Sequence, residues 1–82
     1  MSDLNTTRQK VVAALQQEYG LSAEDAHDAA NAGAYFRSVD PIGRRAESIW
    51  KAMKVAVPMT TQLHTDAYKS GARWAVAHQS AS

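Results

Sequence analysis

Apolar residues recur at helical spacing in four stretches of the chain, most clearly over residues 41–56. Asp40 can accept hydrogen bonds from the first turn of this stretch, and Pro41 suits the first helical position. At about 100° per residue, the apolar positions share one side: Ile42, Ala46, Ile49, Trp50, Met53, Ala56 and Val57. Pro58 then prevents the helix from continuing straight. The pattern predicts a central helix over residues 41–56, packed against all the others.

A first helix is predicted over residues 6–19. Thr6 and Gln9 have the spacing of a capping box, in which each side chain binds the backbone N–H of the other residue. Apolar residues follow at helical spacing: Val11, Val12, Leu15 and Tyr19. Gly20 is suited to the left-handed position that closes many helices.

A second helix is predicted over residues 23–33. Ser22 can cap it, and the acidic residues of its first turn suit the positive end of the helix dipole. Gly33 is expected to stop or distort this helix, because a continuous helix would place Tyr35 on the same side as the acidic residues. The inward-facing residues are mostly alanine, so another helix can approach closely.

A fourth helix is predicted over residues 61–78. Its small residues Ala67, Gly71 and Ala75 are spaced four apart and indicate close packing against the second helix or against a second copy of the chain. No stretch shows the alternation that is typical of a strand. The expected fold is therefore all-α, a single domain over residues 1–82 that forms a bundle of about four helices.

Composition limits the chemistry that this domain can perform. Its 82 residues form a small core, which self-association as a homodimer would help to stabilise. The chain has no cysteine, which excludes disulfides and thiolate metal sites. No apolar run approaches the length of a membrane span, and the first ten residues lack an apolar leader segment. We expect a cytoplasmic protein that does not contact membranes.

Charge is distributed unevenly, although the net charge is only +1. Residues 1–35 carry five acidic and two basic side chains, and residues 36–82 carry seven basic and three acidic ones. This polarity can orient a charged partner or draw the two halves of the fold together. Most of the cations flank or lie on the predicted central helix, which makes its polar side a candidate partner-binding surface, with Trp50 at its margin. The candidate residues are Arg37, Arg44, Arg45, Trp50, Lys51 and Lys54.

The turn at residues 20–22 suggests an alternative, because residues 12–32 locally resemble a helix-turn-helix. The resemblance implies that the second predicted helix would enter the major groove of DNA. That helix carries three carboxylates and no cation in its first two turns, and phosphates would repel these side chains: Glu24, Asp25 and Asp28. A simple helical hairpin accounts for the same residues.

Residues with the spacing of a catalytic or metal site are not evident. His27, His64 and His78 are scattered, and His27 is adjacent to Asp28 instead of at the i, i+4 spacing that presents two ligands to one ion. The chain has no glycine-rich phosphate loop after a strand and no serine in a nucleophile elbow. We therefore expect no enzymatic activity, no catalytic residue, no metal and no cofactor.

These observations favour a protein-binding regulator or inhibitor that docks its basic and aromatic helix face on a larger protein with an acidic surface. Small, cysteine-free helical chains are common among bacterial and phage-encoded regulators, an association that suggests a phage or mobile-element source. The alternative is a nucleic-acid-binding protein of weak sequence specificity, either helix-turn-helix-like or one that uses the same basic helix. Tryptophan at helical spacing is also typical of a core residue, so Trp50 has both interpretations.

Overall fold

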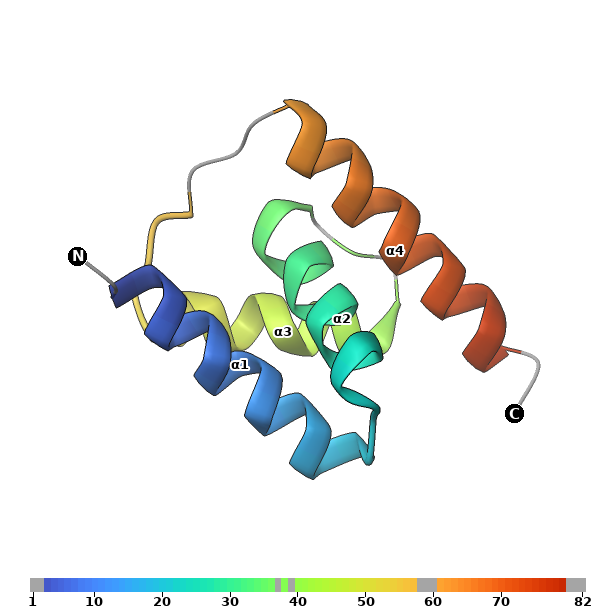
Figure 1. Ribbon diagram of the computed structural model, residues 1–82, viewed down its shortest axis with the longest axis horizontal. Coiled ribbons are helices and arrows are strands. Elements are labelled where there is room, and N and C mark those ends of the chain that lie inside the picture. Colours follow the sequence, from blue (N-terminus) through green and yellow to red (C-terminus); the bar gives the residue numbers. More distant parts are fainter. Residues whose placement is uncertain (1–2, 37, 39, 58–60, 80–82) are drawn as a thin grey trace.

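The computed structural model describes residues 3–36, 38, 40–57 and 61–79. Within these ranges the chain forms four helices and no strand (Figure 1): α1 (Asp3–Tyr19), α2 (Ala23–Tyr35), α3 (Pro41–Ala52) and α4 (Thr61–Gln79). The predicted all-α bundle of about four helices is confirmed. None of the described helices combines the length and the apolar character that a membrane span requires.

Helix α2 occupies the centre of the bundle. It lies between α1 and α4, with α3 passing behind it in the view of Figure 1, and all three helices pack against it. Helix α3 packs mainly against α1 and α2. The prediction that the helix beginning at Pro41 contacts all the others is therefore wrong, because α2 holds that position.

Small side chains allow α2 to contact three neighbours. A Cβ atom on Gly33 would lie only 2.6 Å from the Cβ of Ala46, and one on Gly71 would lie 2.9 Å from the Cβ of Ala32. The backbones of α3 and α4 thus approach α2 more closely than larger residues permit. The close packing predicted for the small residues of the fourth helix is made against α2 through Gly71.

Larger side chains fill the spaces around this closely packed centre. Val11 and Leu15 of α1 are completely buried, and both tryptophans belong to the core. The other large apolar members of the core come from α3: Ile42 and Ile49. Burial of these side chains supplies the main driving force for packing the helices around α2.

Helix α1 begins at Asp3, three residues before the predicted start, so Thr6 lies inside the helix and the predicted capping box is wrong. Leu4 is half-buried and packs against the core, which gives the additional turn a tertiary contact. The C terminus is as predicted. Gly20 has a φ of 67° and its N–H donates to the carbonyl oxygen of Gln16 at 2.8 Å.

Helix α2 continues to Tyr35, two residues past its predicted end. Gly33 does not stop the helix; it is buried where α3 crosses. Tyr35 is buried because α1 covers this end of α2. Arg8 of α1 donates hydrogen bonds to Tyr35 Oη at 2.8 Å and to Asn31 Oδ1. The side of α2 that carries acidic residues in the first turns is therefore covered by α1 at the C-terminal end of the helix.

Helix α3 ends at Ala52, four residues before its predicted end. The N–H of Met53 donates to the carbonyl oxygen of Ile49, and Lys54 adopts a φ of 55°. The chain then turns so that Val55 and Val57 pack against the core. Pro58, the predicted stop, lies outside the described residues. Helix α4 agrees with its prediction to within one residue.

Candidate partner-binding surface

A small network of hydrogen bonds fixes the start of α3. The start sets how the helix is rotated, and therefore on which side its basic residues lie. Asp40 caps the helix, with Oδ1 accepting from the N–H of Gly43 at 2.5 Å, and Pro41 occupies the first turn. The Ser38 hydroxyl donates to Asp40 Oδ2, and Asp40 N–H donates back to Ser38 Oγ at 3.2 Å. The local sequence signals correctly predicted this cap.

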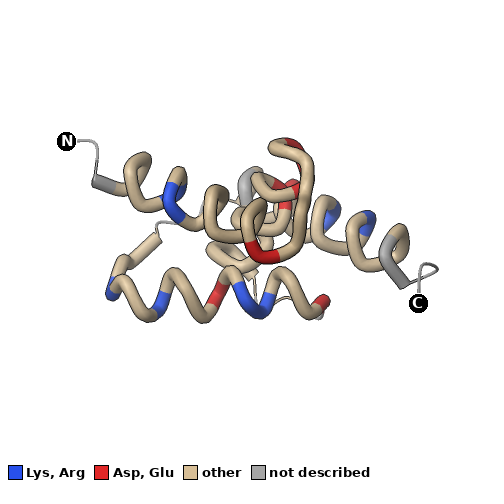
Figure 2. The backbone as a smooth tube through the Cα atoms, turned by 90° about the horizontal axis from the view of Figure 1, so that it is seen from below, with Lys and Arg blue, Asp and Glu red and all other residues tan. Residues whose placement is uncertain are grey.

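Arg44 and Lys51 are exposed on one flank of α3, seven residues and about two turns apart. Glu47 lies between them, and its Oε2 is 3.9 Å from Lys51 Nζ. Lys54 is exposed just beyond the end of the helix. Figure 2 shows α3 as an outer layer on which an acidic position lies between basic ones. Arg44, Lys51 and Lys54 thus form a basic surface that the carboxylate of Glu47 interrupts.

Arg45 lies on the opposite flank and faces α1. Its Nε donates to Glu18 Oε2 at 3.0 Å and its Nη2 donates to Oε1 at 2.8 Å, a two-pronged ion pair. The hydrogen bonds from Arg45 hold the pKa of Glu18 below its ordinary value, and the same bonds raise the pKa of Arg45. Arg45 thus connects α3 to α1, and its guanidinium is less available to a partner than those of the other flank.

Trp50 belongs to the core. Only 3% of its surface is exposed, and its indole Nε1 donates to the backbone carbonyl of Ala30 at 3.1 Å. Of its two sequence interpretations, the core position is the one observed. The prediction that Trp50 is an exposed aromatic anchor for a partner is therefore wrong. Its ring is covered, and its indole N–H already donates a hydrogen bond inside the protein.

A cleft lined by several apolar side chains together with Glu47 and Lys51 runs beside the basic surface. It has a volume of about 250 Å³ and lies between the C-terminal halves of α2 and α3. Its lining residues come from both helices and from the segment after α3: Gly33, Ala34, Tyr35, Phe36, Glu47, Trp50, Lys51, Val55 and Val57. Lys51 therefore belongs to both the cleft and the basic surface, and Trp50 lines the cleft although only 3% of it is exposed.

The sequence pattern gave little indication of this cleft. Val55 falls on a polar side of the helix predicted to extend to residue 56, and only the early end of α3 brings Val55 and Val57 back toward α2. The positive φ at Lys54 that produces this turn has no glycine or asparagine to signal it. Arg37, the remaining predicted surface residue, lies outside the described residues.

The two histidines whose side chains are described, His27 and His64, make separate contacts. The Nδ1 atom of His27 is 3.2 Å from Asn31 Nδ2, and the ring of His64 stacks on Phe36 with centroids 3.7 Å apart. The side chain of His78 lies outside the described residues. Among the described side chains, no three histidines or carboxylates lie close enough to hold a metal ion.

The helix-turn-helix interpretation requires α2 to present a face to DNA. In the structure, α1, α3 and α4 all cover α2, and the exposed positions of its first turns include Glu24 and His27. Asp28 is engaged with Arg73 of α4, with 3.9 Å between the charged atoms. The acidic start of α2 thus attracts α4 inside the fold, and this helix offers no row of cations to phosphate.

Comparison of the chain with protein-family models, curated proteins and solved structures finds no match. The basic surface, defined as Arg44, Lys51 and Lys54, and the cleft beside it share Lys51.

Proposed function

We propose that this chain is a non-enzymatic protein-binding regulator or inhibitor, which docks the basic surface of α3 on an acidic surface of a larger protein. The observation that supports this most directly is the position of Arg44 and Lys51. Both are exposed on one flank of α3, and Lys51 also borders the cleft. Apolar area beside charged and polar residues is the usual composition of a protein–protein interface.

A protein partner fits this surface better than nucleic acid does. Phosphate binding requires a row of cations that is not neutralised nearby. Here Glu47 separates Arg44 from Lys51, and the carboxylate of Glu18 already binds Arg45. A protein surface that has its own mixture of charges can match such a pattern, with its acidic groups opposite the cations and an apolar group in the cleft.

Affinity capture with a charge-reversed variant tests this function. The tagged chain is used to capture its partner from lysate after nuclease treatment, beside a variant that carries Arg44→Glu and Lys51→Glu. A control carries Gln9→Glu, Lys10→Glu and Gln17→Glu, three exposed positions on α1, and changes the net charge equally. We expect the first variant to lose one stoichiometric protein partner that the control retains.

Two results would overturn the proposal. If both variants capture the same protein as well as the unmodified chain does, the partner binds another surface. If the captured material disappears with nuclease, and binding is similar for unrelated sequences and weakens steeply with added salt, the basic surface binds nucleic acid. Circular dichroism of both variants verifies that they are folded before the comparison is made.

A further inference from the structure

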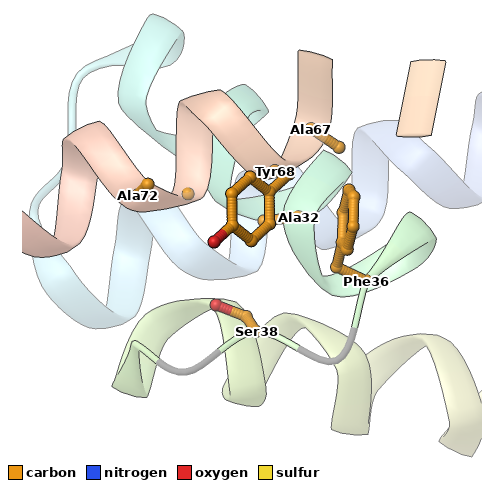
Figure 3. Close-up of a pocket in the computed structure, with 7 residues that line it drawn as sticks. Ala32, Phe36, Ser38, Ala67, Tyr68 and Ala72 are labelled. Atoms are coloured by element: carbon orange, nitrogen blue, oxygen red, sulfur yellow. The ribbon is translucent and has the colours of Figure 1, made fainter. Parts of the chain in front are cut away.

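A second hollow lies between α2, α4 and the connection that leads into α3 (Figure 3). Its volume is about 120 Å³, and its lining residues are Ala32, Phe36, Ser38, Ala67, Tyr68, Gly71 and Ala72. The aromatic rings of Phe36 and Tyr68 flank it, and Ser38 lies beneath them in the close-up. Tyr68 is 62% exposed, so this rim is accessible from solvent.

The hollow is somewhat smaller than a dry protein cavity of about 150 Å³, which binds benzene. Because its rim is open to solvent, an aromatic ring can enter it in part. Here the walls are formed by methyl groups and by Gly71, which packs close to Ala32. The hollow therefore offers an apolar lining with two rings at the entrance, a composition typical of pockets that hold aromatic groups.

The polar groups at one end of the hollow can only accept further hydrogen bonds. Ser38 is 9% exposed, and its hydroxyl hydrogen is used by Asp40 Oδ2. Asp40 is 3% exposed, and its two carboxylate oxygens already accept hydrogen bonds from Gly43 N–H and from the Ser38 hydroxyl. A Cβ atom on Gly71 would lie 3.6 Å from Asp40 Oδ2 and 3.9 Å from Ser38 Oγ, which places both oxygens beneath this part of α4. A ligand that reaches this end must bring a donor.

The entrance is held in position before any ligand binds. The ring of Phe36 stacks on His64 with centroids 3.7 Å apart and 14° between the planes. The same ring meets Tyr68 at 5.2 Å and 53°. These contacts connect the end of α2 to the first turns of α4, so little ordering of Phe36 is needed on binding.

We propose that this hollow binds a tyrosine side chain of the partner protein, with the ring over the alanine wall beside Phe36 and Tyr68 and the hydroxyl donating to Ser38 Oγ. The inference rests on the proposed function, because the tyrosine belongs to the same partner. Phe36 lines both this hollow and the cleft beside the basic surface, so one partner can cover both. Tyrosine combines the apolar ring that the walls fit with the donor that the oxygens lack.

Small-molecule analogues test the hollow without the partner. The probes are p-cresol, which reproduces the tyrosine side chain, and toluene, which reproduces phenylalanine and has no donor. Both are titrated into the isotope-labelled chain while amide resonances are followed by NMR. We expect saturable shifts at Ser38 and Gly71, and p-cresol binding roughly two- to tenfold tighter than toluene, the range that one net hydrogen bond gives.

Two variants separate the contributions of shape and hydrogen bonding. Ser38→Ala is expected to bring p-cresol binding toward that of toluene, because it removes one acceptor. Ala72→Leu is expected to abolish binding of both probes, because Ala72 is exposed at the lining and a larger side chain there fills the entrance. Ala13→Leu, at an exposed position of α1, is the control and should bind both probes unchanged.

The inference is overturned if p-cresol produces no saturable shift, or if toluene binds as tightly as p-cresol to the unmodified chain. Retention of probe binding by Ala72→Leu would also overturn it, because the probe would then be bound elsewhere. These results are independent of the charge-reversal capture. A chain that captures its partner through Arg44 and Lys51 but does not bind p-cresol keeps its proposed function and loses only the tyrosine pocket.

Discussion

Lys54, two residues past the end of α3, has a φ of 55°, in the left-handed region that residues with a Cβ atom rarely adopt. Glycine adopts this region without steric cost but loses more backbone entropy on folding. We expect Lys54→Gly to raise the free energy of unfolding by up to about 1 kcal/mol. Urea denaturation followed by circular dichroism measures this change.

Lys10→Gly is the matched control for this substitution. Lys10 is exposed inside α1, where glycine costs about 1 kcal/mol relative to a good helix former. The two substitutions remove the same side chain and should shift stability in opposite directions. A loss of stability in both would show that Lys54 does not adopt the left-handed conformation in solution.

The ion pair between Glu18 and Arg45 gives stability a dependence on pH. Hydrogen bonds from Arg45 lower the pKa of Glu18 in the folded chain, so the unfolded chain binds this proton more readily. The stabilisation is complete above the ordinary pKa of about 4.5 and is lost as the pH falls through the lower pKa of the folded state. Glu18→Gln should therefore lower the melting temperature at pH 7 and have less effect at pH 3.

Thermal unfolding at both pH values, with Gln17→Ala as an exposed neighbouring control, measures this difference. The control should show no comparable change between pH 7 and pH 3, because Gln17 does not titrate. An equal effect of Glu18→Gln at the two pH values would contradict the role of the ion pair. The pair is exposed to solvent, so added salt should also weaken its contribution.

Residues that act through their own neighbours in sequence were predictable. The Asp40 cap, the Pro41 start and the Gly20 terminus depend on backbone geometry within a few residues, and the structure has all three. The partner of Arg45 was not predictable, because Glu18 is 27 residues away. The uneven distribution of charge between the two halves of the chain indicated that ion pairs between them could form, but not which residues would pair. The contact between Arg73 and Asp28 is a second ion pair of this kind.

At the level of the elements, the crossing of α2 and α3 depends on Gly33. A Cβ atom there would lie 2.6 Å from Ala46 Cβ, from the backbone nitrogen of Glu47 and from the carbonyl oxygen of Gly43. Two of these atoms are backbone and cannot move independently of α3. We expect Gly33→Ala to destabilise the fold by about 1–3 kcal/mol despite the higher helix propensity of alanine.

Chemical denaturation of Gly33→Ala tests this crossing, with Ser48→Ala on the exposed side of α3 as the control. The control should be neutral or slightly stabilising, because alanine is the better helix former and no neighbour is displaced. A stabilising Gly33→Ala would show that the two helices are farther apart than the structure indicates. The same glycine explains why the predicted end of α2 was wrong, since close packing and helix termination both favour glycine.

The presence of each helix was predictable from the sequence, whereas helix ends that depend on tertiary packing were less so. Helix α1 extends to Asp3 with Leu4 against the core, and α3 stops at Ala52 where Val55 and Val57 turn toward α2. In both cases, contacts with other helices outweigh the local signals at Thr6 and Pro58 that set the predicted ends. The cleft beside the basic surface results from the second of these changes, so it could not have been predicted from the sequence pattern.

At the level of the whole molecule, the central position of α2 was hidden by its composition. Amphipathic patterns give weight to bulky residues, and α3 carries Ile42, Ile49 and Trp50 on one side. Helix α2 buries mainly alanine and glycine, so its pattern is weaker although three helices pack against it. Small residues allow several helices to pack closely around one helix. The amphipathic pattern of that helix does not show how many helices pack against it.

This arrangement predicts an order of stability among the helices. Helix α2 cannot separate without disrupting the packing of α1, α3 and α4, whereas α4 packs principally against α2. Native-state hydrogen exchange should therefore find the slowest amides in α2, opening only with global unfolding, and faster exchange in α4. The two tryptophans provide a second measurement, because Trp50 reports on α3 and Trp74 on α4.

Single-tryptophan variants Trp74→Phe and Trp50→Phe, unfolded in urea and followed by fluorescence, separate the two signals. We expect the midpoint of the Trp74 transition, measured in Trp50→Phe, to lie at lower urea than the midpoint of circular dichroism of the same variant, because α4 separates first. The midpoint of the Trp50 transition, measured in Trp74→Phe, should lie at higher urea than that of circular dichroism, because the signal of α4 is lost earlier. Coincident transitions in both variants, together with equal protection of α2 and α4, would show that the four helices unfold as one unit. Separation of α4 would open the hollow lined by Tyr68 and Gly71, so saturating p-cresol should bring the Trp74 transition closer to the global one.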